Sequence, residues 1–150
     1  MSVRIREAVK SDLPALIGLY GELSLDGPRE DTAAIERYAA AFSEIESRTG
    51  HHVLVADDDG RLLGSVTVIV EPNLTYKGAP FAIIENVVVT EGARGKGVGA
   101  LIMNAAVDIA REAGCYKVML TSNKRRPEAH RFYERLGFKA SHEGFQLRFS

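Results

Sequence analysis

The sequence predicts a single α/β domain over residues 1–150, in which a mixed sheet carries helices on both faces. Apolar residues recur at helical spacing in some segments and form alternating or continuous runs in others, so helices and strands are interleaved. Strand–helix–strand units in the second half imply parallel pairing, whereas an early hairpin implies antiparallel pairing. A chain of 150 residues is long enough for one hydrophobic core.

The first half of the chain is expected to hold one strand, two helices and a hairpin. Alternating apolar and charged residues mark the first strand, and apolar residues at helical spacing mark the helices. The hairpin turn, Asp57 to Gly60, has a composition typical of tight turns. The expected elements are a strand at Val3–Glu7, a helix from Leu13 with Ser11-Asp12 as its N-cap, a helix from Asp31 to about Arg48, and strands at His52–Ala56 and Arg61–Val70.

The second half begins, after a loop from Glu71 to Pro80, with the dense apolar run Phe81–Val89. Its Ile and Val content predicts a central strand that is buried on both faces. Glycines are expected to end the later helices. The remaining elements are expected to be a helix from Val98 to about Ala110, closed by Gly114, a strand at Tyr116–Thr121, a helix at Pro127–Leu136, and strands at Phe138–Ser141 and Phe145–Phe149.

Composition excludes several classes of protein. A formal net charge of −1 gives no general attraction to nucleic acid or to an anionic membrane. Cys115 is the only cysteine, so it forms no internal disulfide and no cysteine-rich metal site, which fits a reducing cytoplasmic setting. The N-terminus lacks the apolar core of a signal peptide, and no apolar run approaches the ~20 residues of a membrane span.

A glycine-rich basic turn, Arg94-Gly95-Lys96-Gly97-Val98-Gly99, separates the buried strand from the long helix. Glycines let backbone N–H groups approach a ligand, and the helix N-terminus adds unpaired donors and a partial positive charge. Arg94 and Lys96 add full charges, so the turn is suited to a pyrophosphate. The alternative is a tight strand-to-helix turn that happens to be basic.

Two other phosphate-binding loops do not fit the spacing. A P-loop needs glycine at position 90 and Ser or Thr at position 97, where the chain has Thr90 and Gly97. A dinucleotide fingerprint forced onto Gly95, Gly97 and Ala100 would lie in the middle of the chain. It would also lack an acidic ribose partner in the region where one is expected.

The turn instead matches the R-x-x-G-x-G signature of GNAT N-acetyltransferases at Arg94, Gly97 and Gly99. Three further segments resemble that superfamily: Glu85–Val89 its central strand, Ala129–Phe138 its second motif, and Val3–Tyr20 its first strand and helix. The resemblance covers nearly the whole chain, with two motifs in the correct order and spacing. It implies a GNAT fold, with about seven strands flanked by about four helices and a splay between the fourth and fifth strands.

The resemblance also implies acetyl-CoA as cosubstrate and assigns residues to it. The pantetheine arm would pair with the backbone of the central strand, and the turn would hold the pyrophosphate. A polar residue after the next strand often reaches the cofactor in such proteins, although the Asn123–Pro127 stretch departs from the common pattern, so Asn123 is equally a loop or helix-cap residue. The implied cofactor-binding residues are Val87, Val88, Val89, Arg94, Gly95, Lys96, Gly97, Val98, Gly99, Ala100 and Asn123.

Acetyl transfer to an amine requires a base for the protonated amine and an acid for the departing thiolate. By resemblance, Tyr133 is the general acid; its alternative is a packed aromatic beside Phe132. Glu85 interrupts an apolar run, where a charge is expensive without a purpose, and burial would raise the pKa of such a carboxyl toward a base's range. The alternative for Glu85 is a structural or substrate-orienting carboxylate. A backbone N–H near Val88 would polarise the attacked carbonyl.

The remaining polar candidates are weaker. Adjacent strand residues point to opposite faces, so His51 and His52 are expected to be strand-end histidines, and no ligand spacing completes a metal site around them. Cys115 has no evident base beside it. The basic cluster Lys124–Arg126 would add to the field around CoA phosphates, bind an acidic substrate, or be a solvated helix entry.

The acceptor is expected to be a small-molecule primary amine, bound between the helical region Leu25–Ser47 and the loop Glu71–Pro80. Ile84–Val89 and Gly114–Val118 resemble glucosamine-6-phosphate N-acetyltransferases, which are dimers, although Thr121–Pro127 does not. The alternatives are therefore that sugar phosphate, a protein or peptide amine, a non-catalytic acetyl-CoA-binding module, or a nucleotide-binding module. A homodimer is an expectation from the resemblance alone.

Overall fold

The computed structural model describes residues 2–27 and 29–149 of the chain. Its contacts divide the chain into two compact units, Met1–Met119 and Leu120–Ser150, and each unit is described by itself. The first unit contains the sheet, the glycine-rich turn and the helix that follows it.

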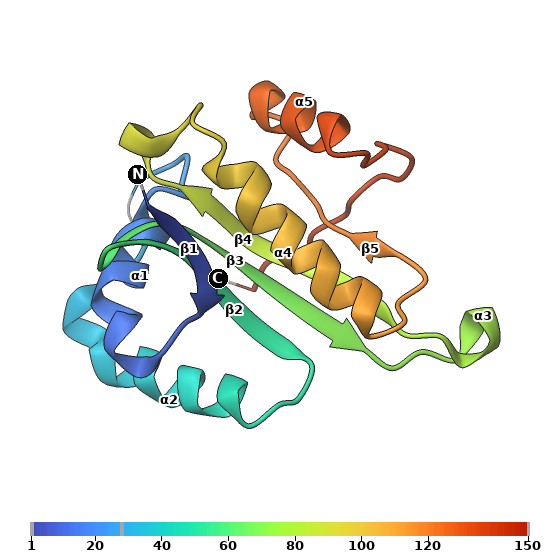
Figure 1. Cartoon of the computed structure of the whole chain (residues 1–150), viewed down its shortest axis with the longest axis horizontal. Helices are drawn as coiled ribbons and strands as arrows, with labels where there is room; N and C mark the ends of the chain where they lie inside the picture. Colours follow the sequence, from blue (N-terminus) through green and yellow to red (C-terminus); the bar gives the residue numbers. More distant parts are fainter. Residues whose placement is uncertain (1, 28, 150) are drawn as a thin grey trace. The chain divides into compact units, whose positions relative to one another are not determined.

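The first unit is built on a five-stranded sheet in the order β1-β2-β3-β4-β5 (Figure 1). Neighbouring strands from β1 to β4 are antiparallel, and β5 is parallel to β4. The sheet is therefore mixed, as predicted. The strands are β1 Val3–Glu7, β2 His51–Asp58, β3 Arg61–Glu71, β4 Phe81–Val89 and β5 Val118–Met119.

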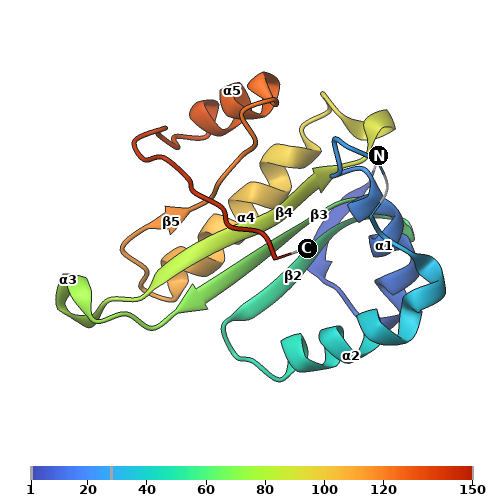
Figure 2. The same cartoon turned by 180° about the vertical axis from the view of Figure 1, so that it is seen from behind.

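The described residues of the first unit form four α-helices. The longest, α4, lies on the face of the sheet that is turned to the viewer in Figure 1 and behind the sheet in Figure 2. Short 3-10 turns at Lys10–Asp12, Thr32–Ala34 and Glu91–Ala93 lead into or out of these elements. The helices are α1 Leu13–Gly21, α2 Ile35–Glu46, α3 Thr75–Gly78 and α4 Val98–Glu112.

The core has two layers because β2 is buried on both faces. Val53 and Val55 belong to a cluster with α1 and α2 that includes Leu16 and Phe42. Successive strand residues point to opposite faces, so Leu54 and Ala56 lie toward α4. The buried side of α4 consists of Val98, Ile102, Met103, Ala106 and Ala110, which is the helical spacing seen in the sequence.

The second unit contains α5, Pro127–Arg135, which ends before Gly137 at a φ of 98°. The two strands expected after it, Phe138–Ser141 and Phe145–Phe149, are wrong: no strand pairing is described for residues 138–149. Phe145, Leu147 and Phe149 do alternate, but they are 93%, 82% and 95% exposed. An alternating pattern produces a strand only where a neighbouring strand provides hydrogen-bond partners for its backbone N–H and C=O groups.

The expected count of about seven strands and four helices is therefore corrected to five strands and five α-helices within the described residues. The additional helix is α3, a single turn in which Tyr76 and Lys77 have positive φ. The strand expected at Tyr116–Thr121 is reduced to Val118–Met119. The expectation that Phe81–Val89 is buried on both faces is also wrong, since only Ala82, Ile84 and Val88 are buried there.

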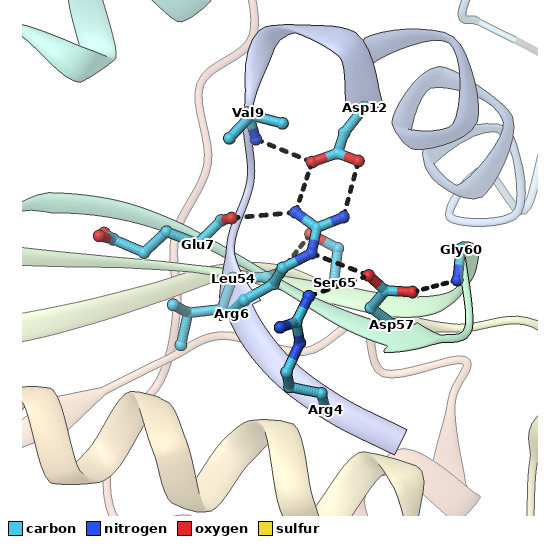
Figure 3. Close-up of polar contacts among 9 residues, drawn as sticks. All are labelled: Arg4, Arg6, Glu7, Val9, Asp12, Leu54, Asp57, Gly60 and Ser65. Atoms are coloured by element: carbon cyan, nitrogen blue, oxygen red, sulfur yellow. Dashed lines mark hydrogen bonds and ion pairs between the residues drawn. The ribbon is translucent and has the colours of Figure 1, made fainter. Parts of the chain in front are cut away.

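Arg6 ties three segments of the first unit together (Figure 3). Its guanidinium donates two hydrogen bonds to Asp12, at 2.8 and 3.0 Å, and one to Asp57 at 2.9 Å. Asp57 also accepts from the Gly60 N–H, and Asp12 accepts from the Val9 N–H. Asp12 therefore does not cap α1 with its side chain as the sequence suggested, because its carboxylate faces Arg6.

The Arg6 cluster makes stability depend on pH. The hydrogen bonds from Arg6 hold the pKa values of Asp12 and Asp57 below the ordinary 3.8. A depressed carboxyl pKa contributes stability above the unfolded-state value, and this contribution is lost as pH falls through the folded-state value. Arg6 thus stabilises the first unit across the neutral range and ceases to do so only in strong acid.

We predict that Arg6→Met lowers the Tm by about 5 °C at pH 7, because two carboxylates lose their charged donor. The difference from wild type should be constant from neutral pH to about pH 5 and shrink below 3.8, as the carboxyls protonate. Thermal unfolding followed by circular dichroism measures it. Arg111→Met is the matched control, since Arg111 pairs with Asp108 on the exposed surface of α4. Equal shifts for both variants would contradict a stabilising role for Arg6.

Candidate functional site

The glycine-rich turn joins the end of β4 to the start of α4. Gly95 and Gly97 have φ of 78° and 84°, a left-handed conformation that residues with a Cβ rarely adopt. A Cβ at either position would meet no atom within 4 Å. Glycine is therefore required at both positions by backbone conformation rather than by crowding, and the turn is open to an approaching ligand.

The N-terminus of α4 has unsatisfied donors. Gly97 is the N-cap, with no side-chain capping bond, and the first helical hydrogen bond runs from the Leu101 N–H to the Gly97 carbonyl at 3.2 Å. The N–H groups of the residues between them have no partner within the helix. Together with the helix dipole and the exposed Lys96, they form a site that fits an anionic group such as a pyrophosphate.

Arg94 is engaged in holding this turn in place. Its Nε donates to the Val89 carbonyl at 2.9 Å, and its Nη2 donates to Glu22 at 3.4 Å. Glu22 follows α1 and also accepts from the Thr90 hydroxyl at 2.8 Å and from the Glu91 N–H at 3.1 Å. The turn is thus fastened both to β4 and to the end of α1, and the charge of Arg94 lies beside it.

A β-bulge interrupts β4 just before the turn. Thr67 is opposite Glu85 and Ser65 is opposite Val88, so two residues of β4, Asn86 and Val87, face Val66 alone. Asn86 has a φ of 54°, and asparagine is among the residues that tolerate this conformation. A bulge leaves its extra residue unpaired and re-aims the neighbouring side chains. Asn86 was not singled out from the sequence, although an asparagine within a run of β-branched residues was the available signal.

Close contact between β3 and β4 continues beyond the bulge. A Cβ at Gly64 would come within 2.7 Å of the Val88 carbonyl, so only glycine allows this approach. On the other edge, β4 pairs with β5 only at Ala82 and Ile83 within the described residues. The predicted cofactor-binding residues Val87, Val88 and Val89 therefore present a backbone edge without a β5 partner. Such an edge can pair with an extended ligand.

A cavity of about 340 Å³ lies on the face of the sheet that carries α1 and α2. Glu85 and Asn86 line it, so it reaches the bulge. The expected burial of Glu85 is wrong, because its side chain is exposed. At Glu85 and Asn86, β4 borders the cavity, whereas Val88 of the same strand packs in the core cluster with α1 and α2. The lining residues are Leu13, Leu16, Tyr20, Tyr38, Ala41, Phe42, Ile45, His51, Val53, Thr67, Ile69, Glu85 and Asn86.

Two titratable side chains in the cavity were not identified as site residues from the sequence. Burial raises the pKa of Tyr20, although hydrogen bonds with Ser65 and Thr67 partly offset the effect. Burial also lowers the pKa of His51, and the charges of Arg48 and His52 act in the same direction. The side chains of His51 and His52 have different surroundings, as expected for adjacent residues of a strand. His52 bonds Glu7 at 2.5 Å, whereas His51 lines the cavity.

The second unit contains Tyr133 and Asn123. Tyr133 packs against Phe132 and Phe138, with ring centroids 5.3 and 6.1 Å away, and burial raises the pKa of its phenol. Its proton is thus retained at neutral pH. The Asn123 side chain accepts from the Arg125 N–H at 2.9 Å, in a turn that leads into α5. This geometry matches the helix-entry alternative, and a cofactor contact for Asn123 stays a prediction.

Residues 2–27 and 29–149 contain no group of three His, Cys, Asp or Glu side chains arranged to hold a metal ion. Within the same residues, no helix has both the length and the apolar character needed to cross a membrane.

Comparison with known proteins gives consistent matches. The model of the acetyltransferase (GNAT) family matches residues 16–138. A glucosamine 6-phosphate N-acetyltransferase of Trypanosoma brucei brucei is 31% identical over 149 residues, which cover 98% of this chain and 96% of that protein. A rice protein (Oryza sativa subsp. japonica), described as a probable glucosamine 6-phosphate N-acetyltransferase, is 35% identical over 143 residues, covering 91% of this chain and 82% of its own.

Solved structures also match. A crystal structure described as a transcriptional regulator from Bacillus halodurans C-125 is 38% identical, with a TM-score of 0.91. The match covers 98% of this chain and 99% of the other.

We predict that Gly97→Ala weakens CoA binding about tenfold, because a left-handed alanine costs roughly 1–2 kcal/mol and tends to close the turn. Titration calorimetry with CoA measures the Kd. Gly92→Ala is the matched control: Gly92 lies in the adjacent 3-10 turn, is exposed, and has no crowding around an added Cβ. If Gly97→Ala binds CoA as tightly as Gly92→Ala, the turn does not hold the cofactor.

Proposed function

Because the chain belongs to the acetyltransferase (GNAT) family and is an N-acetyltransferase, we propose that it transfers the acetyl group of acetyl-CoA directly to a primary amine of a small molecule. One observation supports this most strongly. The bulge at Asn86 lies where a ligand-sized cavity reaches the strand that leads into the anion-binding turn. An acceptor in that cavity would therefore lie beside the strand along which we propose that the cofactor runs.

Acetyl-CoA supplies a thioester: the amine nitrogen forms a bond to its carbonyl carbon, the carbon–sulfur bond breaks, and sulfur leaves as a thiol. For an amine that arrives protonated, two protons must be removed from nitrogen and one delivered to sulfur. One proton is released overall. The residues of this chain would bind the two substrates, orient them and move these protons.

The cofactor half of the site would use the backbone. Val87, Val88 and Val89 would pair with the extended pantetheine arm along the open edge of β4. The turn and the first residues of α4, positions 94–100, would hold the pyrophosphate, with Arg94 fixing the turn and Lys96 supplying charge. A backbone N–H close to Val88 would polarise the thioester carbonyl. Asn123 stays a predicted cofactor contact that rests on the family resemblance alone.

Glu85 and Tyr133 would carry the protons. Glu85 lies at the bulge, and its exposed carboxylate can accept a proton from an ammonium group directly or through one water. Tyr133 would protonate the departing sulfur, and the raised pKa of its phenol keeps the proton in place at neutral pH. The assignment of Tyr133 rests on its position in the second GNAT motif.

Glucosamine 6-phosphate is a second candidate acceptor, favoured by the names of two relatives that cover most of this chain. A protein or peptide amine is less well supported, because the cavity is of a size for small ligands. A non-catalytic acetyl-CoA sensor would be compatible with the description of the similar Bacillus halodurans protein as a transcriptional regulator. A homodimer remains an expectation.

The deciding experiment is an assay of thiol release from acetyl-CoA by the purified protein with a panel of amines. The panel should hold amino sugars, polyamines, amino acids, aminoglycosides, arylalkylamines and lysine peptides. Release that depends on a small amine supports the proposal. Release with lysine peptides alone, or tight CoA binding without release in the presence of any amine, would contradict it.

We predict that Tyr133→Phe lowers kcat by about 100-fold or more while the Kd for CoA changes less than twofold, because the variant keeps the ring and loses only the acidic proton. Stopped assays with the best amine give kcat, and calorimetry gives the Kd. Phe138→Tyr is a control for ring packing in the same cluster. An unchanged kcat would remove Tyr133 from the acid role.

We predict that Glu85→Gln lowers kcat/KM by about 100-fold at pH 7 and by less at higher pH, where more of the amine is already neutral. The pH profile of kcat/KM between 6.5 and 9.5 measures this. Glu112→Gln, an exposed carboxylate at the end of α4, is the control. A profile for Glu85→Gln that is parallel to wild type would show that Glu85 orients the substrate and does not take its proton.

A further inference from the structure

The walls of the cavity beside the bulge are hydrocarbon. Side chains from α1, α2, β2 and β3 converge there, and most of them carry no polar group. These are Leu13, Leu16, Ala41, Phe42, Ile45, Val53 and Ile69. A ligand that fills this space gains by removing apolar surface from water, and a ligand covered with hydroxyl or phosphate groups does not.

Two of the polar side chains in the lining, Tyr20 and Tyr38, already interact with polar groups of the protein. Tyr20 interacts with the side chains of Ser65 and Thr67, which act to lower the pKa of its hydroxyl. The Tyr38 hydroxyl donates to Glu30 at 3.0 Å and accepts from the Asp31 N–H at 3.1 Å. A sugar would have to displace these interactions to bond either tyrosine, which leaves His51, Glu85 and Asn86 as the polar side chains that it could bond directly.

The charge in the lining is negative. Glu85 is its only Asp, Glu, Lys or Arg among the described residues. His51 is neutral at pH 7: its pKa is lowered by burial and by Arg48 and His52, and only Glu71 opposes them. Arg48, whose charge acts on His51, lines a neighbouring hollow with Glu46 and not this cavity. A phosphate group inside would meet a carboxylate and no lysine or arginine from the lining.

We propose, on the basis of the function above, that the acceptor is a primary amine carried on an apolar body, such as an aryl or alkyl group, and not a phosphorylated amino sugar. The ammonium group lies at Glu85 beside the bulge, and the hydrocarbon fills the space between α1, α2 and the sheet. The cavity of about 340 Å³ is at the lower end of small-molecule sites, which suits a single ring or a short chain.

The first test compares acceptors in the thiol-release assay with wild-type protein. Hexylamine and phenethylamine represent the apolar class, and glucosamine and glucosamine 6-phosphate represent the sugar class. We expect kcat/KM for phenethylamine to exceed that for glucosamine 6-phosphate at least tenfold, because the ring is buried and the phosphate is excluded. A preference for glucosamine 6-phosphate over both apolar amines would overturn the inference and leave the proposed function standing.

Ala41 and Ala40 provide a matched pair of variants. Both are exposed residues of α2, but only Ala41 lines the cavity. Ala41→Lys should lower kcat/KM for phenethylamine at least tenfold and raise it for glucosamine 6-phosphate, because it adds a cation to the wall. Ala40→Lys should stay within about twofold of wild type for both amines. Equal behaviour of the two variants would overturn the inference.

A result without turnover is also decisive. Absence of thiol release with every amine would overturn the proposed function, and calorimetry would then test the cavity alone. Binding of phenethylamine to the CoA-loaded protein, lost in Ala41→Lys and kept in Ala40→Lys, supports the inference. Absence of phenethylamine binding to wild type overturns it. The Tm of each variant confirms that it is folded.

Discussion

The interrupted pairing of β4 is the constraint on which the rest of the first unit depends. Backbone N–H and C=O groups need partners, and a strand inside a sheet normally finds them on both edges. Here the ladder to β3 skips at the Asn86 bulge, and the ladder to β5 stops at Ile83. The strand therefore has no β5 partner on one edge in the segment that leads to the glycine-rich turn. A ligand that runs along this segment would complete the sheet.

The surrounding contacts hold that segment in place while it lacks partners. Gly64 lets β3 approach the Val88 carbonyl beyond the bulge, where a side chain would force the strands apart. Arg94 and Glu22 fasten the turn to the Val89 carbonyl and to the end of α1. At the opposite edge of the sheet, Arg6 joins β1 to the start of α1 and to the β2–β3 turn. Both ends of α1, which borders the cavity, are thus fixed by ion pairs.

The sequence predicted well what depends on local chemistry. The four strands from β1 to β4, the hairpin turn at Asp57–Gly60 and the glycine-rich turn before α4 were found close to their observed positions, because alternation, turn residues and glycine preferences act within a few residues. Prediction from the sequence failed where the structure depends on residues far away along the chain. Phe145, Leu147 and Phe149 alternate like a strand but have no described ladder, and the exposure of Glu85 depends on a cavity formed by helices far away in the sequence.

The two halves of the candidate site rest on different physics, and this explains why family membership indicates the cofactor more firmly than the acceptor. The proposed cofactor half would use backbone groups, a helix dipole and two left-handed glycines, so it would need few particular side chains. The acceptor half is a cavity whose character is set by each side chain of α1, α2 and the sheet. A relative with 31% identity can therefore share the first half and differ in the second. A single charged side chain can change acceptor preference strongly. A lysine in an apolar wall would favour an anionic ligand, whereas without it the same ligand would lose its hydration and gain no partner. The side chains of this chain, and not the names of its relatives, are therefore the better guide to its acceptor.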